Sequence, residues 1–238
     1  VTYASLDQVG QTTAFNGSAI VSSAKPVAAI VNVIAASGAG TRVSASYGGI
    51  SSVTPELTLP LIMKNNGAKI FDTNFNVQNA SSTDVNVTVS YIPSSSGNTG
   101  CQQTATIKAG SSKTFNQATD SDYTGCSGTG LGTKFVGSAK VTATGGNIAA
   151  AVLEGSTINL LSYTGFSAGA NSPVFPLINS FNNGNVTGIQ IANLGNADTN
   201  VTVSYTPGKD GNGNNIGTAC TETQTISAGG SKTFALAA

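Results

Sequence analysis

The chain repeats one ordered set of short sequence blocks. The first copy reads Pro60-Leu61-Ile62, Asn86–Tyr91 and Ala109–Phe115, and the second reads Pro176-Leu177-Ile178, Asn200–Tyr205 and Ala228–Phe234. A further match joins Phe15–Ala19 to Phe135–Ala139. Matched positions lie 114 to 120 residues apart, so a chain of 238 residues has room for two copies of one small domain. The repeat therefore predicts two similar domains.

Alternating apolar and polar residues mark the clearest block as a half-buried strand. Over Asp84–Tyr91 the valines and the tyrosine fall on one face and the polar residues on the other, and Thr199–Tyr205 repeats the pattern. No segment has the capped apolar period of a helix. Similar runs predict strands at Gly17–Val21, Val27–Ala35, Arg42–Tyr47, Leu57–Met63, Phe71–Gln78, Gln103–Ile107, Ser112–Phe115, Ala139–Thr144, Ile148–Leu153, Asn159–Tyr163, Val174–Ile178, Gly188–Asn193, Glu222–Ile226 and Ser231–Phe234.

These short strands, separated by Gly-, Pro- and Asn-rich turns, predict an all-β fold. Seven or eight antiparallel strands in about 115 residues match a β-sandwich of immunoglobulin-like size, so we expect two tandem antiparallel β-sandwich repeats. The matched blocks place one complete repeat at 57–170. Residues 171–238 would then be the front half of a second repeat, and 1–56 of the same or a neighbouring chain its back half. The alternative is two sequential sandwiches, 1–133 and 134–238.

The composition of the chain argues against some classes of binding partner. Ten basic and ten acidic residues balance, and charged residues make up 8% of the chain. This gives no electrostatic footprint for nucleic acid, and no apolar run reaches the length of a membrane span. A β-rich chain covered by hydroxyl and amide side chains is typical of the outside of the cell. We therefore expect an extracellular, cell-surface protein.

The three cysteines are placed unevenly. Cys101 and Cys220 occupy the same position in the repeat, whereas Cys126 lies in a segment with no counterpart. We predict a Cys101–Cys126 disulfide, which would stabilise the fold by about 3 kcal/mol in the chain-entropy model. Cys220 would then be free or would pair with another molecule, and the alternative is three free, buried thiols.

Residues that carry enzymatic chemistry are scarce. The chain has no histidine, three glutamates at unmatched positions and no Cys-x-x-Cys spacing. We therefore expect no enzyme, no catalytic residues, no metal site and no cofactor. Among its Asn-x-Ser/Thr sequons, Asn86 and Asn200 recur at one repeat position on the polar face of their strands, which makes them the candidate glycosylation sites.

The repeated blocks resemble a repeat found in tandem in secreted bacterial surface proteins. The resemblance is carried by Pro60-Leu61-Ile62, Asn86–Tyr91, Ala109–Phe115, Gly137–Val141 and Tyr163–Phe166. It implies a β-sandwich, export and a surface role, and it brings no catalytic residues.

A chain that starts with a back half and ends with a front half suggests head-to-tail assembly. We predict a structural subunit of an extracellular filament or surface fibre, built from copies of itself by β-strand complementation. The assembly strand is expected at Val1, Thr2, Tyr3, Ala4 and Ser5. The competing outcome is closure of the two halves within one chain. The alternative function is a monomeric surface adhesin or carbohydrate-binding module, with glycans as partners.

Overall fold

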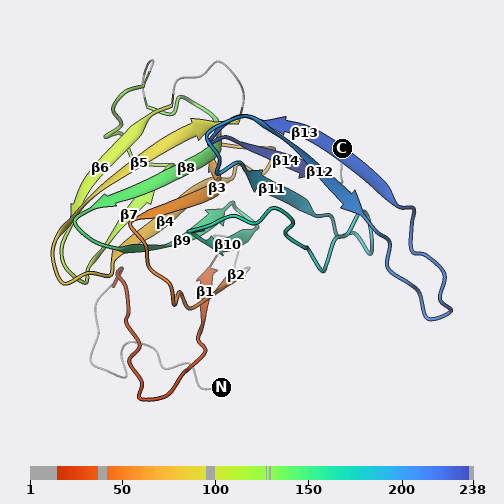
Figure 1. The fold of residues 1–238 in the computed structure, drawn as a ribbon, viewed down its shortest axis with the longest axis horizontal. Helices are drawn as coiled ribbons and strands as arrows, with labels where there is room; N and C mark the ends of the chain where they lie inside the picture. Colours follow the sequence, from red (N-terminus) through yellow and green to blue (C-terminus); the bar gives the residue numbers. More distant parts are fainter. Residues whose placement is uncertain (1–14, 37–41, 95–99, 127, 129, 236–238) are drawn as a thin grey trace.

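The computed structural model describes residues 15–36, 42–94, 100–126, 128 and 130–235 (Figure 1). Within these ranges there is no helix, and the predicted all-β fold is confirmed. The assembly strand predicted at Val1–Ser5 lies outside the described residues. The strands are β1 (Ile30–Ala36), β2 (Arg42–Gly48), β3 (Glu56–Lys64), β4 (Asp72–Asn79), β5 (Val85–Pro93), β6 (Gln102–Ile107), β7 (Ser112–Asn116), β8 (Phe135–Thr144), β9 (Ile148–Gly155), β10 (Leu160–Thr164), β11 (Gly188–Ala192), β12 (Thr199–Tyr205), β13 (Cys220–Ile226) and β14 (Ser231–Ala235).

Strands β3 to β10 form two four-stranded antiparallel sheets, which we call the central sandwich (Figure 1). One sheet has the order β3-β8-β5-β6 and the other the order β10-β9-β4-β7. In β4 and β5 alternate residues are buried, because successive side chains of a strand point to opposite faces. Phe75 and Phe115 stack in the core with ring centroids 5.1 Å apart. Both sheets thus combine strands from before and after residue 133.

The last four strands form a much smaller assembly, which we call the C-terminal half (residues 171–235). It consists of two two-stranded sheets, β11-β14 and β12-β13. The buried apolar side chains between them are Ile189, Val203, Ile226 and Phe234. Figure 1 shows these strands extending from one side of the central sandwich.

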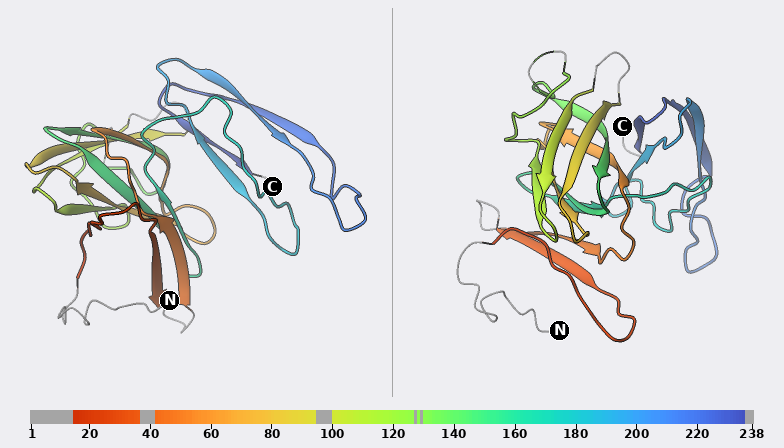
Figure 2. Two further views of the ribbon diagram at one scale, coloured as in Figure 1. Left: turned by 60° about the horizontal axis from the view of Figure 1, so that its bottom comes forward. Right: turned by 60° about the vertical axis from the view of Figure 1, so that its left-hand side comes forward.

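The first described residues form an N-terminal segment (residues 15–50). It begins as extended chain and continues as the antiparallel hairpin β1-β2. The hairpin lies against β10, where the Ser162 hydroxyl donates to the Ser46 carbonyl oxygen at 2.7 Å. Both views in Figure 2 place the hairpin away from the C-terminal half.

Two predicted strands do not form. Gly17–Val21 and Val174–Ile178 have the apolar content of strands, but both are extended chain outside the sheets. Neither segment lies in the ladder of any described strand. A strand is stabilised by cross-strand pairs more than by its own residues, and this explains why sequence pattern alone predicted too many.

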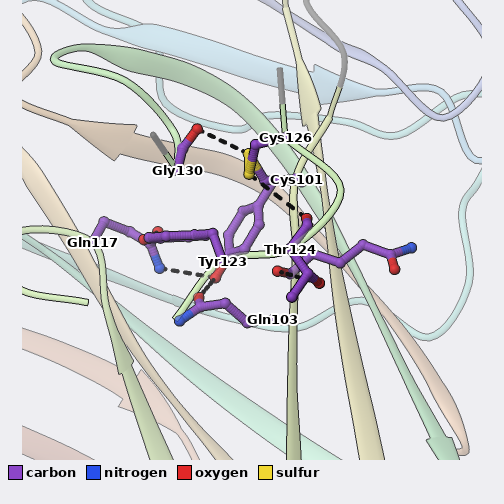
Figure 3. The surroundings of a disulfide bond; sticks show 9 residues. Cys101, Gln103, Gln117, Tyr123, Thr124, Cys126 and Gly130 are labelled. Carbon is purple, nitrogen blue, oxygen red and sulfur yellow. Dashed lines mark hydrogen bonds between the residues drawn. A yellow bond between two sulfur atoms is a disulfide. The ribbon is translucent and has the colours of Figure 1, made fainter. Parts of the chain in front are cut away.

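The predicted disulfide between Cys101 and Cys126 is present, with the Cα atoms 4.6 Å apart (Figure 3). It joins the start of β6 to the loop that follows β7. Beside it the Tyr123 hydroxyl donates to Gln117 Oε1 at 2.7 Å, so the loop is held by a partly buried polar contact as well. Cys220 is exposed and is not in a disulfide.

Candidate assembly interface

The C-terminal half reproduces the contacts of β4–β7 in the central sandwich. The amide of buried Asn79 donates to the carbonyl oxygens of Thr83 and Ile107 at 2.7 and 3.0 Å. The amide of Asn193, which is also buried, donates to the carbonyl oxygens of Ala197 and Ile226 at 2.7 and 3.1 Å. These donors and acceptors are related by the sequence repeat, so the same asparagine fixes the same turn in both places.

A second set of contacts also recurs. Thr106 donates to Asn86 Oδ1 at 2.8 Å, and Thr225 donates to Asn200 Oδ1 at 2.7 Å. Both asparagines are exposed on their strands, as expected for the two candidate glycosylation sites. Strands β12 and β13 therefore have the pairing of β5 and β6.

What differs between the two copies is the number of neighbours each strand has. In the central sandwich, β5 pairs with both β6 and β8, and β4 pairs with both β7 and β9. Among the described residues, β12 pairs with β13 alone and β11 with β14 alone. The C-terminal half thus has two free strand edges at the places where the central sandwich has β8 and β9.

A groove of about 310 Å³ lies beside one of these edges. Its walls include Phe175, Leu177, Ile178 and Ile189. Leu177 is 73% exposed. Its counterpart, Leu61, has both backbone polar groups hydrogen-bonded to the Tyr163 hydroxyl of β10. The groove therefore lacks the strand that covers the same position in the central sandwich.

The N-terminal segment contains the counterparts of the missing strands. Its apolar positions match those of β8 and β9, in the pairs Phe15/Phe135, Val21/Val141, Val27/Ile148 and Val31/Val152. The central-sandwich members are buried, with at most 6% exposed, whereas the N-terminal members are 37 to 70% exposed. The matched side chains are thus buried in one copy of the repeat and exposed in the other.

The C-terminal half also holds an unsatisfied polar group. The Tyr205 hydroxyl is buried and has no hydrogen-bond partner among the described residues. Its counterpart, the Tyr91 hydroxyl, donates to Gln103 Oε1 at 2.5 Å and accepts from Gln117 Nε2 at 3.0 Å. Burial, followed by the charge of Glu222, raises the pKa of Tyr205. The core of the C-terminal half therefore lacks the hydrogen-bond partners that the equivalent hydroxyl has in the central sandwich.

Other kinds of site are not visible in the described ranges. These residues contain no group of three or more potential metal ligands and no helix that could cross a membrane. No known protein family matches the chain, and no curated protein or solved structure matches it significantly. The resemblance to repeats of secreted surface proteins thus stays an expectation.

The sequence analysis did not single out every part of this candidate interface. It placed the assembly strand at Val1–Ser5 and did not single out the hairpin of β1 and β2. A signal was present, because Val27-Ala28-Ala29 and Val31 match Ile148-Ala149-Ala150 and Val152 of β9. The match is short and rich in alanine, so it becomes visible only once β9 is known to be a central strand.

Proposed function

We propose that this protein is a structural subunit of an extracellular filament, assembled head-to-tail by β-strand complementation between copies of the chain. In this proposal a second sandwich forms from the C-terminal half of one copy and the N-terminal segment of the next. The observation that carries it is the pair of unpaired edges on β11 and β12, together with exposed counterparts of β8 and β9 in the same chain.

The energetics favour completion of the second sandwich. Phe15, Val21, Val27 and Val31 are exposed in the single chain, and full burial of such side chains contributes about 1.5 to 3 kcal/mol each. Open sheet edges and apolar faces are rarely tolerated in soluble proteins, because they promote association. Donor and acceptor surfaces differ and lie on separate parts of the molecule. A contact of this heterologous kind builds an open filament unless the rotation closes a ring.

An extracellular location agrees with the covalent chemistry of the chain. The Cys101–Cys126 disulfide is of a kind that persists in oxidising compartments such as the outside of the cell. Few charges and many Ser, Thr and Asn residues fit a surface that repeats along a fibre without long-range repulsion.

Negative-stain electron microscopy of the purified protein tests this function. We expect fibres from the full chain and none from a variant that lacks residues 1–50. The central sandwich of the variant should remain folded, because β3–β10 supply all strands of its two sheets. A full chain that stays monomeric at high concentration would overturn the proposal and favour the adhesin alternative.

A further inference from the structure

Resting on this proposed function, we infer that the joint between neighbouring subunits copies the joint between the two repeats inside one subunit. Residues 15–36 and 42–49 of the neighbouring copy dock on the C-terminal half in the register that β8, β9 and β10 have on β3, β4 and β5. The filament is then a continuous row of equivalent sandwiches, with two sandwiches for each chain.

The first argument is a hydrogen bond that occurs twice. The Ser138 hydroxyl of β8 donates to the Gly229 carbonyl oxygen at 3.0 Å, and this bond links the central sandwich to the C-terminal half. The Ser18 hydroxyl donates to the Gly110 carbonyl oxygen at 3.4 Å. Ser18 and Gly110 are the repeat counterparts of Ser138 and Gly229. The N-terminal segment thus contacts the central sandwich as β8 contacts the C-terminal half.

The two acceptor carbonyls belong to turns of the same shape. Gly110 and Gly229 have φ values of 69° and 67°, in the left-handed region that glycine adopts readily. Each turn connects a matched pair of strands, β6 to β7 and β13 to β14. The joint is therefore built from the same local structure on both sides of the central sandwich.

The second argument is the register that the central sandwich prescribes. Val141 of β8 lies opposite Val89 of β5, and Val152 of β9 lies opposite Phe75 of β4. Transferred through the repeat, the first pair becomes Val21 of the neighbouring copy opposite Val203. The second pair becomes Val31 of the neighbouring copy opposite Ile189. Both positions carry apolar residues, as the core requires.

The third argument is the match between the hairpin and the groove. Tyr47 lies opposite Val31 in β1-β2, as Tyr163 lies opposite Val152 in β9-β10. Tyr163 bonds to the backbone of Leu61, whose counterpart Leu177 lines the groove. The docked hairpin places the Tyr47 ring over Leu177 and fills the groove with a side chain of the right type.

Cysteine cross-linking between copies tests this register. Lys140 lies opposite Ser90 and Thr142 opposite Thr88, so Ile20 should lie opposite Ser204 and Ser22 opposite Thr202. Two matched double variants are made in a Cys220→Ser background, Ser204→Cys with Ile20→Cys and Thr202→Cys with Ser22→Cys. The controls exchange partners, Ser204→Cys with Ser22→Cys and Thr202→Cys with Ile20→Cys. The exchanged positions lie diagonally, beyond the usual reach of a disulfide.

After mild oxidation of assembled protein, the matched variants should give a ladder of covalent oligomers on a non-reducing gel, and the exchanged variants should run as monomers. Stronger linking in one of the two exchanged variants means a two-residue slip in the corresponding direction and overturns the inferred register. Fibres that form without a ladder in any variant overturn the inferred joint and leave the filament function standing. Absence of fibres from the unmodified protein contradicts the filament function itself.

Discussion

Glu154 is a carboxylate in the core of the central sandwich. It projects from β9, is 3% exposed, and its Oε1 has no hydrogen-bond partner among the described residues. Burial raises the pKa of Glu154 to about 7. The folded protein therefore favours the protonated form, and the stability that this contributes is fully present at low pH and lost as the pH rises through about 7.

Replacing this carboxyl with an amide should remove the pH dependence. Between pH 4.5 and about 7 the wild-type free energy of unfolding should fall by on the order of 3 kcal/mol, and Glu154→Gln should be nearly flat over this range. Urea unfolding followed by near-ultraviolet circular dichroism measures both. Glu56→Gln is the control, because that side chain is exposed at the end of β3. If the free energy of unfolding of Glu154→Gln fell with pH as steeply as that of the wild type, the Glu154 carboxyl would not be the group responsible.

The matched asparagines allow each copy to be weakened separately. Asn79→Ala removes an amide with two backbone acceptors and should lower the stability of the central sandwich by about 2 to 3 kcal/mol. Asn193→Ala should leave the unfolding midpoint of the central sandwich unchanged and reduce fibre formation, since it loosens only the C-terminal half. Unfolding curves and electron microscopy on both variants check this. A loss of central-sandwich stability in Asn193→Ala but not in Asn79→Ala would contradict the correspondence between the turns that these two asparagines fix.

Individual elements of this protein differ in whether a disulfide bond holds them to the rest of the fold. The loop after β7 is held to β6 by the Cys101–Cys126 disulfide, which closes a sequence separation of 25 residues. The C-terminal half has no equivalent bond, because the counterpart cysteine, Cys220, is free.

Removal of the disulfide should therefore destabilise the central sandwich specifically. Cys101→Ser with Cys126→Ser should lower its free energy of unfolding by about 3 kcal/mol, as expected for a loop of this length. Cys220→Ser is the matched control and should have little effect, because its side chain is exposed. Thermal unfolding of the three proteins measures the difference. Equal loss in the control would mean that the disulfide does not provide the stability.

At the scale of the whole molecule, the described residues form one closed sandwich with different unpaired surfaces on its two flanks. A chain without its N-terminal segment keeps the acceptor edges of β11 and β12 but cannot supply a strand to the next copy. Such a chain should behave as a terminator of assembly.

Mixed assembly tests this behaviour. A variant that lacks residues 1–50, added at about one part in ten, should shorten the fibres of the full chain several-fold. This follows because each incorporated variant accepts a neighbour and donates none. Fibre lengths in electron micrographs give the readout. A variant with Ile191→Asp in addition should be inactive, since its acceptor edge is disrupted. Fibres of unchanged length would contradict donation by the N-terminal segment.

The sequence was sufficient to predict the strands whose alternation is strong. Asp84–Tyr91 and Thr199–Tyr205 carry their pattern in side chains that are adjacent along the chain, so no knowledge of neighbours is needed. The repeated blocks likewise predicted that β12 would resemble β5. The positions of the cysteines favoured a disulfide between Cys101 and Cys126, which the structure contains, but left three free thiols as an alternative.

Strand pairing could not be predicted from the sequence in the same way. Gly17–Val21 and Gly137–Val141 have similar composition, yet the second lies in the central strand β8 and the first is extended chain, because only the second has strand partners on both sides. The burial of Glu154 and the unsatisfied Tyr205 hydroxyl are likewise consequences of which strands meet. Local pattern determines which segments can become strands. Hydrogen bonds and apolar contacts between distant segments determine which of them do, and these contacts exist only in the folded molecule.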